Sequence, residues 1–174
     1  HRIISGQSWK DIKRVPEKPV NFLLVDDLED NLTSLEALLR RGGLALLTAQ
    51  SGEEALEFLL RNDVALALLD VQMPGLEGFE PAELMRGSER SRHIPIIFLT
   101  AGSADGHRRS RGYEAGAVDF IQKPIEPDIL RSKANVFYDL YRQRQQLAAQ
   151  RDALEAQAEG LRRLEELARR QLGQ

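Results

Sequence analysis

The chain has 174 residues, of which 42% are hydrophobic and 29% are charged, and its net charge is -3. This composition is typical of a globular protein with one ordinary domain and some surplus length. The small negative charge gives no support for binding to nucleic acid or to anionic membranes. The absence of cysteine excludes disulfides, thiolate metal sites and thiol catalysis. No apolar run approaches the ~20 residues of a membrane-spanning helix, so we expect a soluble protein without membrane partners.

The first 19 residues show no sustained periodicity and end in a segment that contains Pro16 and Pro19. We predict that residues 1–19 form an arm or linker. The chain begins with His1 rather than Met, and nothing there resembles a signal peptide. We therefore expect an excised piece of a longer, cytoplasmic protein.

From residue 20 to about residue 130, short apolar runs alternate with stretches of helical spacing. The runs, which predict buried strands, are residues 21–25, 44–48, 64–69, 94–99 and 117–121. The predicted helices between them are a leucine stripe from Leu32 to Leu39 that Gly42 and Gly43 stop, a segment that opens at Ser51, and weaker segments at about 80–87 and 104–115. Strict alternation predicts a parallel, doubly wound α/β sheet of five strands, since right-handed crossovers leave few other arrangements.

The last segment is a helix that does not stop. From Asp128 to Leu172 there is no proline, and Gly160 is the only internal glycine. Its outer part reads as a weak heptad repeat over residues 131–174, with one apolar column formed by Leu140, Leu147, Leu154 and Leu161. The second column is mixed and includes Arg144 and Arg151. We expect a homodimer through this helix, because an isolated projecting helix lacks tertiary packing; a single solvated helix is the alternative.

Polar side chains end four of the five apolar runs. Asp26 and Asp27 follow the first run, Asp70 the third, Thr100 the fourth and Lys123 the last. Because the carboxyl ends of parallel strands share one edge of a sheet, these groups belong to one site. Carboxylates suit a hard divalent cation, and the ammonium and hydroxyl suit a small anion.

With this set of residues, the sequence resembles the receiver domains of two-component response regulators over residues 20–130. The five groups occur in the family's order, with 43 residues from Asp27 to Asp70, 30 to Thr100 and 23 to Lys123. The segment Asp70-Val-Gln-Met-Pro-Gly and the pair Lys123-Pro124 also match sequence motifs of the family. The resemblance implies the flavodoxin-like receiver fold, here with its last helix extended.

The resemblance also implies roles. Asp70 would accept a phosphoryl group from a phosphohistidine of a histidine kinase or histidine phosphotransfer protein. Asp26 and Asp27, with Asp70 and the backbone carbonyl of Gln72, would hold Mg²⁺. Lys123 would bind a phosphoryl oxygen.

Three further residues would form the switch. Thr100 would turn toward the phosphoryl group, Ala101 would keep access to it open, and Phe120 would turn inward in response. The chain would then be a signalling switch that relays its state through the long helix, with no enzymatic activity beyond its own phosphorylation and dephosphorylation. The sequence of residues 129–144 resembles the corresponding sequence of receivers that precede the kinase portion of hybrid histidine kinases.

Two alternatives belong to other classes. A degenerate receiver would serve only as a dimerisation module, although such members usually lose the acceptor or the lysine. A phosphatase with an aspartate nucleophile typically carries a second acid two residues later, where this chain has Gln72. The arginines of the long helix alternate with acids, as on a solvated helix face, and do not indicate nucleic-acid binding.

Overall fold

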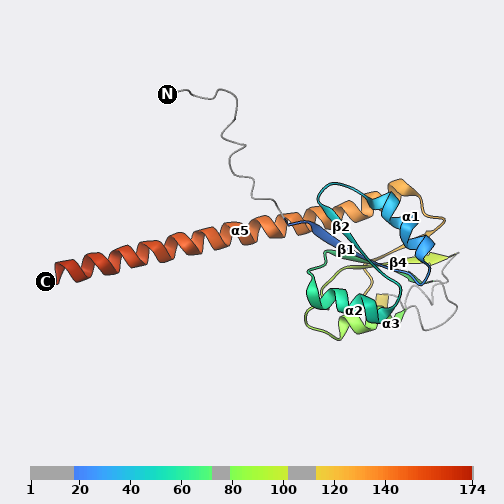
Figure 1. Cartoon of the computed structure of the whole chain (residues 1–174), viewed down its shortest axis with the longest axis horizontal. Coiled ribbons are helices and arrows are strands. Elements are labelled where there is room, and N and C mark those ends of the chain that lie inside the picture. The colour runs from blue at the N-terminus through green and yellow to red at the C-terminus, as the bar shows by residue number, and fades with distance from the viewer. Residues whose placement is uncertain (1–17, 72–78, 102–112, 174) are drawn as a thin grey trace, which may run out of the picture.

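A computed structural model describes residues 18–71, 79–101 and 113–173 of the chain (Figure 1). Its centre is a five-stranded parallel sheet with the order β2-β1-β3-β4-β5. The strands are β1 (Val20–Val25), β2 (Leu44–Ala49), β3 (Leu66–Val71), β4 (Ile96–Ala101) and β5 (Asp119–Lys123). The order reverses between β1 and β3, and ligand sites of open α/β sheets form beyond the strand ends at such a reversal.

Side-chain capping and proline placement account for where two of the helices begin. Among the described residues, α1 (Glu29–Leu39), α2 (Gly52–Arg61) and α3 (Glu80–Arg86) lie between strands, and α5 (Pro127–Leu172) follows β5. The hydroxyl of Ser51 accepts a hydrogen bond from the backbone N–H of Glu54, which confirms the predicted cap of α2. Pro81 lies in the first turn of α3, where its missing N–H costs no helical hydrogen bond.

Two apolar layers cover the sheet, one on each face. One layer joins Leu23, Leu69 and Phe98 of the strands to α2 and α3. The other joins strand residues of the opposite parity to α1 and α5. Because successive strand side chains point to opposite faces, continuous apolar strands fill both layers, as a doubly wound sheet requires.

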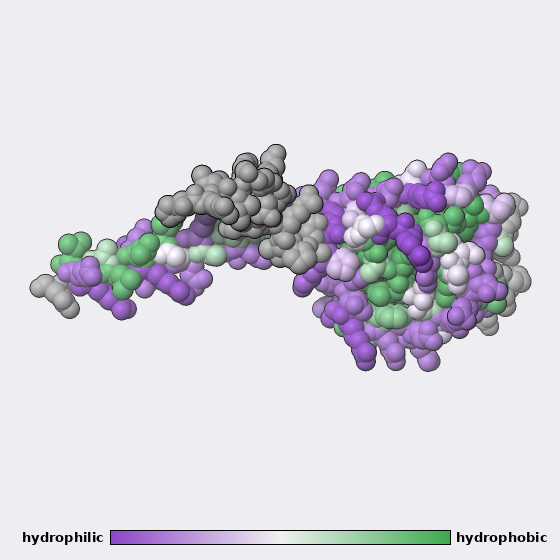
Figure 2. Space-filling model, turned by 45° about the horizontal axis from the view of Figure 1, so that its top comes forward, coloured by the Kyte–Doolittle hydropathy of each residue, from purple (hydrophilic) through white to green (hydrophobic). Residues whose placement is uncertain are grey.

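The first part of α5 packs on the sheet, and the rest projects from the body (Figure 1). Leu130, Ala134 and Tyr138 are buried, so packing continues beyond the predicted boundary at residue 130. The Tyr138 ring lies 3.7 Å from Cζ of Arg41, and its hydroxyl accepts a hydrogen bond from Arg142. The helix has 46 residues, about 70 Å of length. Figure 2 shows hydrophobic and hydrophilic residues side by side along the projecting part.

All five strands differ from their predicted bounds; β1 begins one residue earlier and β2 ends one residue later than predicted. β3, β4 and β5 begin and end two residues later than the apolar runs that predicted them, so Asp70, Thr100 and Lys123 lie within strands rather than after them. The reason is that ladder pairing depends on backbone register, and the side-chain pattern does not report it. Residues 1–17 of the predicted arm at 1–19 and residues 104–112 of the predicted helix at 104–115 lie outside the described residues. No helix among the described residues is long and apolar enough to cross a membrane.

Candidate functional site

Three of the predicted site residues meet at the carboxyl edge of the sheet. Asp26 directly follows β1, Asp70 is the penultimate residue of β3, and Lys123 ends β5. The ammonium of Lys123 forms an ion pair with Oδ2 of Asp70. The Asp70 side chain is only 2% exposed and that of Lys123 is 22% exposed. The site is therefore a partly desolvated charge cluster at the topological reversal of the sheet.

The two carboxylates of the cluster influence each other. The pKa of Asp70 is raised to about 7, chiefly by burial and also by the adjacent Asp26, while Lys123 opposes the rise. Burial also works against ionisation of Asp26, but its contacts with Asp70 and with the backbone N–H of Leu28 outweigh burial and hold its pKa below the ordinary value. The Leu28 N–H donates to Oδ1 of Asp26 at 2.9 Å. Asp26 is thus the ionised member of the pair, and Asp70 is the member that is partly protonated near neutral pH.

The donor set fits a divalent cation. Oδ2 of Asp26 and Oδ1 of Asp70 are buried and have no hydrogen-bond partner among the described residues. A buried carboxylate oxygen without a donor is stabilised by a cation, and oxygen ligands are those that Mg²⁺ prefers. Asp27 is exposed beside this pair, and Gln72 lies outside the described residues. Within 18–71, 79–101 and 113–173, no three acidic or histidine side chains are grouped closely enough to hold a metal by themselves.

The predicted switch residues lie beside the cluster. Thr100 is half-buried and pairs in register with Val71 of β3, directly after Asp70. Ala101 is exposed and pairs with Lys123. Phe120 is half-buried; its ring centroid lies 5.7 Å from that of Phe98. The ring centroid of Tyr113 lies 5.0 Å from that of Phe120, in an edge-to-face arrangement. A turn of the Phe120 ring would therefore disturb its contact with buried Phe98 and its contact with the exposed Tyr113.

Sequence reasoning missed the neighbours that α1 contributes. A cavity of about 210 Å³ beside the two acids is also lined by Asn31 and Ser34 of α1 and by Pro124 and Ile125 after β5. The amide nitrogen of Asn31 is buried without a partner among the described residues. The sequence position of Asn31 could have predicted this neighbour, because Asn31 lies in the first turn of the helix that follows β1, and that turn begins at the carboxyl edge of the sheet.

The predicted dimer column is solvent-exposed. Leu140, Leu147, Leu154 and Leu161 are 45%, 64%, 66% and 63% exposed. Leu140 follows the buried Tyr138 by two residues, and the other three lie further along α5. The column is therefore available to a partner.

Comparison with known proteins decides the family. The family model for the response regulator receiver domain matches residues 22–135. The chain belongs to the response regulator receiver family. A protein of Vibrio cholerae serotype O1 described as "Probable cyclic di-GMP phosphodiesterase" is 36% identical over 154 residues, which cover 86% of this chain and 33% of the relative. Response regulator PleD of Caulobacter vibrioides is 39% identical over 109 residues, or 63% of this chain and 24% of PleD.

A solved receiver shares the fold of this one. The receiver domain of a sensor histidine kinase from Pseudomonas aeruginosa PAO1, with a magnesium ion coordinated in its active-site cleft, is 30% identical with a TM-score of 0.59, over 68% of this chain and 97% of that one. Phosphorylation-dependent signalling is the general function of two-component receivers. The chain spans a third or less of the length of the two curated relatives.

Proposed function

We propose that this receiver accepts a phosphoryl group on Asp70. The observation that carries the proposal is the buried Asp70 carboxylate, which lies at the sheet's reversal between an acid, Asp26, and a lysine, Lys123. A carboxylate that served only the fold would not be placed against a second buried carboxylate, because their repulsion costs free energy. Such clusters of opposed charges with a raised pKa are typical of functional sites.

Asp26, Asp27, Asp70 and the backbone carbonyl of Gln72 would hold Mg²⁺. When bound, the ion neutralises charge on the phosphoryl oxygens and keeps Asp70 ionised. The unpartnered oxygens of Asp26 and Asp70 support this assignment. In the receiver of the Pseudomonas kinase, the coordinated magnesium lies in the active-site cleft.

The chemical step is a phosphoryl transfer from a phosphohistidine of a histidine kinase or phosphotransfer protein. A carboxylate oxygen of Asp70 forms the new oxygen–phosphorus bond, the nitrogen–phosphorus bond breaks, and the imidazole nitrogen keeps the electron pair and takes a proton. Lys123 then exchanges its partner, from the Asp70 carboxylate to a phosphoryl oxygen. Positioning and charge neutralisation supply most of the catalysis in such transfers.

The signal would leave the site through Thr100, Ala101 and Phe120. Thr100 would turn to donate a hydrogen bond to the phosphoryl group, Ala101 would leave room for it, and Phe120 would occupy the space that Thr100 vacates. The changed surface would bias α5, which packs on the same sheet and carries the change outward. We propose that the receiver works in the cytoplasm as a homodimer through α5, and that the chain catalyses only its own phosphorylation and dephosphorylation.

The test is covalent modification. Acetyl phosphate with Mg²⁺ should add one phosphoryl group, which intact mass spectrometry detects, and Asp70→Asn should abolish the addition. Asp139→Asn, at an exposed acid of α5, is the matched control and should leave it unchanged. Single-site uptake that persists in Asp70→Asn would remove Asp70 as the acceptor. No uptake by the wild-type chain would favour the degenerate, dimerisation-only receiver.

A further inference from the structure

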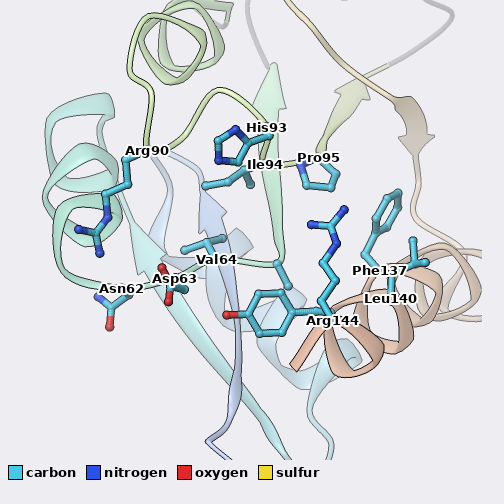
Figure 3. Close-up of a pocket in the computed structure, with 12 residues that line it drawn as sticks. Asn62, Asp63, Val64, Arg90, His93, Ile94, Pro95, Phe137, Leu140 and Arg144 are labelled. Carbon is cyan, nitrogen blue, oxygen red and sulfur yellow. The ribbon is translucent and has the colours of Figure 1, made fainter. Parts of the chain in front are cut away.

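A second pocket lies at the opposite edge of the sheet from Asp70 (Figure 3). It has a volume of about 280 Å³ and is bounded by three segments: the connection before β3, the connection before β4, and α5. It shares no residue with the cavity beside Asp26 and Asp70. The residues that line it are Asn62, Asp63, Val64, Ala65, Arg90, His93, Ile94, Pro95, Phe137, Leu140, Tyr141 and Arg144.

The floor of this pocket is apolar. Val64, Ala65 and Ile94 are buried where the chain enters β3 and β4. Phe137 and Tyr141, one turn apart on α5, are half-buried and form an aromatic wall. Burial raises the pKa of Tyr141, so its hydroxyl is partly withdrawn from water. The pocket therefore offers apolar and aromatic surface to a ligand rather than only a charged rim.

Cationic side chains approach this floor from two elements. Arg144 extends from α5 toward Pro95, and Arg90 lies on the far side of the pocket near Asn62 and Asp63 (Figure 3). His93 lies at the rim of the pocket between the two arginines (Figure 3). Neither arginine makes an ion pair or a side-chain hydrogen bond with any other residue that the structure describes. Two unpaired guanidinium groups at one apolar concavity form a receptor for an anionic group.

We propose that this pocket binds a small organic anion, with a phosphate or carboxylate group carried on an aromatic body. The aromatic body would lie on the floor against Phe137 and Tyr141. The anionic group would lie near Arg144 and His93 and away from Asp63, whose charge acts on Tyr141. The volume of about 280 Å³ lies just below the ~300–1,000 Å³ typical of ligand pockets, so the ligand has about one ring and one charged group.

The heptad pattern gives an independent reason to assign a role to Arg144. The residue stands in the second column of the seam, next to Leu140, where an apolar residue would stabilise a dimer. Its side chain is directed toward Pro95 of the body (Figure 3). The positive charge of Arg144 weakens association through the seam. An anion bound at the pocket would neutralise that charge and so reduce its cost to the dimer. A bound ligand would also join the connection before β4 to α5.

The test is a titration of the isotope-labelled full chain, followed by amide chemical shifts, without Mg²⁺ so that the Asp70 edge does not attract phosphate. The probe is phenyl phosphate, for which we expect a dissociation constant on the order of 1 mM. Benzoate should shift the same resonances, around Ala65, Ile94 and Tyr141. Inorganic phosphate and benzyl alcohol, each with half of the recognised chemistry, should bind at least about tenfold more weakly.

Two variants separate a site from general electrostatics. Arg144→Gln should weaken phenyl phosphate binding about tenfold, because it removes charged hydrogen bonds. Arg170→Gln, at an exposed arginine of α5 that lies outside the pocket and outside both columns of the seam, should leave binding unchanged. Shifts confined to the Asp70 edge, equal losses in both variants, or an undiminished response in Arg144→Gln would each overturn the proposal.

Discussion

The guanidinium of Arg86 donates a hydrogen bond to the backbone carbonyl of Gly116, 30 residues further along the chain, with 2.6 Å between Nη2 and the oxygen. A second donor of the same group reaches the carbonyl of Ile94 at 2.9 Å. One side chain at the end of α3 thus links the connection before β4 to the turn before β5. Gly116 has a φ of +95°, and a Cβ there would clash with Nε of Arg86.

Gly116→Ala should therefore lower the free energy of unfolding by about 1–3 kcal/mol, because the added methyl group meets both an unfavourable φ and the Arg86 side chain. Urea denaturation measures the change. Gly42→Ala is the matched control, since no atom lies within 4 Å of a Cβ at that position. It should change stability by no more than about 0.5 kcal/mol. Equal losses in the two variants would show that the Arg86 contact does not restrict Gly116.

Lys123→Ala should uncouple modification from the switch. Without the ammonium, nothing from β5 engages the phosphoryl group, so beryllofluoride with Mg²⁺ should no longer shift the ring resonances of Phe120. Lys133→Ala is the control, because Lys133 pairs with Asp119 through side chains that are about one-third exposed. That pair should contribute only about 0–1 kcal/mol and leave the Phe120 response unchanged. A normal Phe120 response in Lys123→Ala would show that Lys123, like Lys133, forms only a weak ion pair and does not act in the switch.

The sequence was sufficient to predict the sheet, the helices α1, α2, α3 and α5, and the meeting of Asp26, Asp70 and Lys123. These follow from apolar runs and from the geometry of parallel strands, which are local or topological properties. The Arg86 bridge and the pocket near Arg144 could not be predicted. Each depends on side chains from segments far apart in the sequence, whose mutual placement is decided by packing.

The stability of the Mg²⁺-free protein should fall as pH rises toward neutrality. The pKa of Asp70 is about 7 in the folded protein against an ordinary 3.8, so between these values the folded chain binds a proton that the unfolded chain releases. More bound protons in the folded state make the free energy of unfolding decrease with increasing pH. Asp70→Asn cannot titrate, so its stability relative to wild type should increase from about pH 5 to about pH 8.

Urea denaturation in the presence of a chelator measures this difference, with Asp139→Asn as the control for a lost exposed charge. Adding Mg²⁺ at about pH 8 should then stabilise the wild type more than Asp70→Asn. The ion binds only the folded site, and the variant lacks the carboxylate that Asp70 supplies to it. A gap between wild type and Asp70→Asn that stays constant over this pH range would show that Asp70 titrates normally.

The projecting part of α5 should associate as a parallel dimer with the receivers at one end. The exposed column of Leu147, Leu154 and Leu161 favours association, while Arg144 and Arg151 in the second column weaken it. We expect a micromolar dissociation constant, about -8 kcal/mol. Sedimentation of the full chain measures it.

Two changes test which face associates. Leu154→Asp should abolish the dimer, whereas Leu167→Asp, at another exposed leucine about 140° around the helix, should leave it intact. Truncation after Gln145 should give a folded monomer, because it keeps buried Tyr138 and the hydrogen bond between Arg142 and Gln145. A full chain that stays monomeric at high micromolar concentration, with and without beryllofluoride, would remove both the leucine seam and any relay through a helix pair.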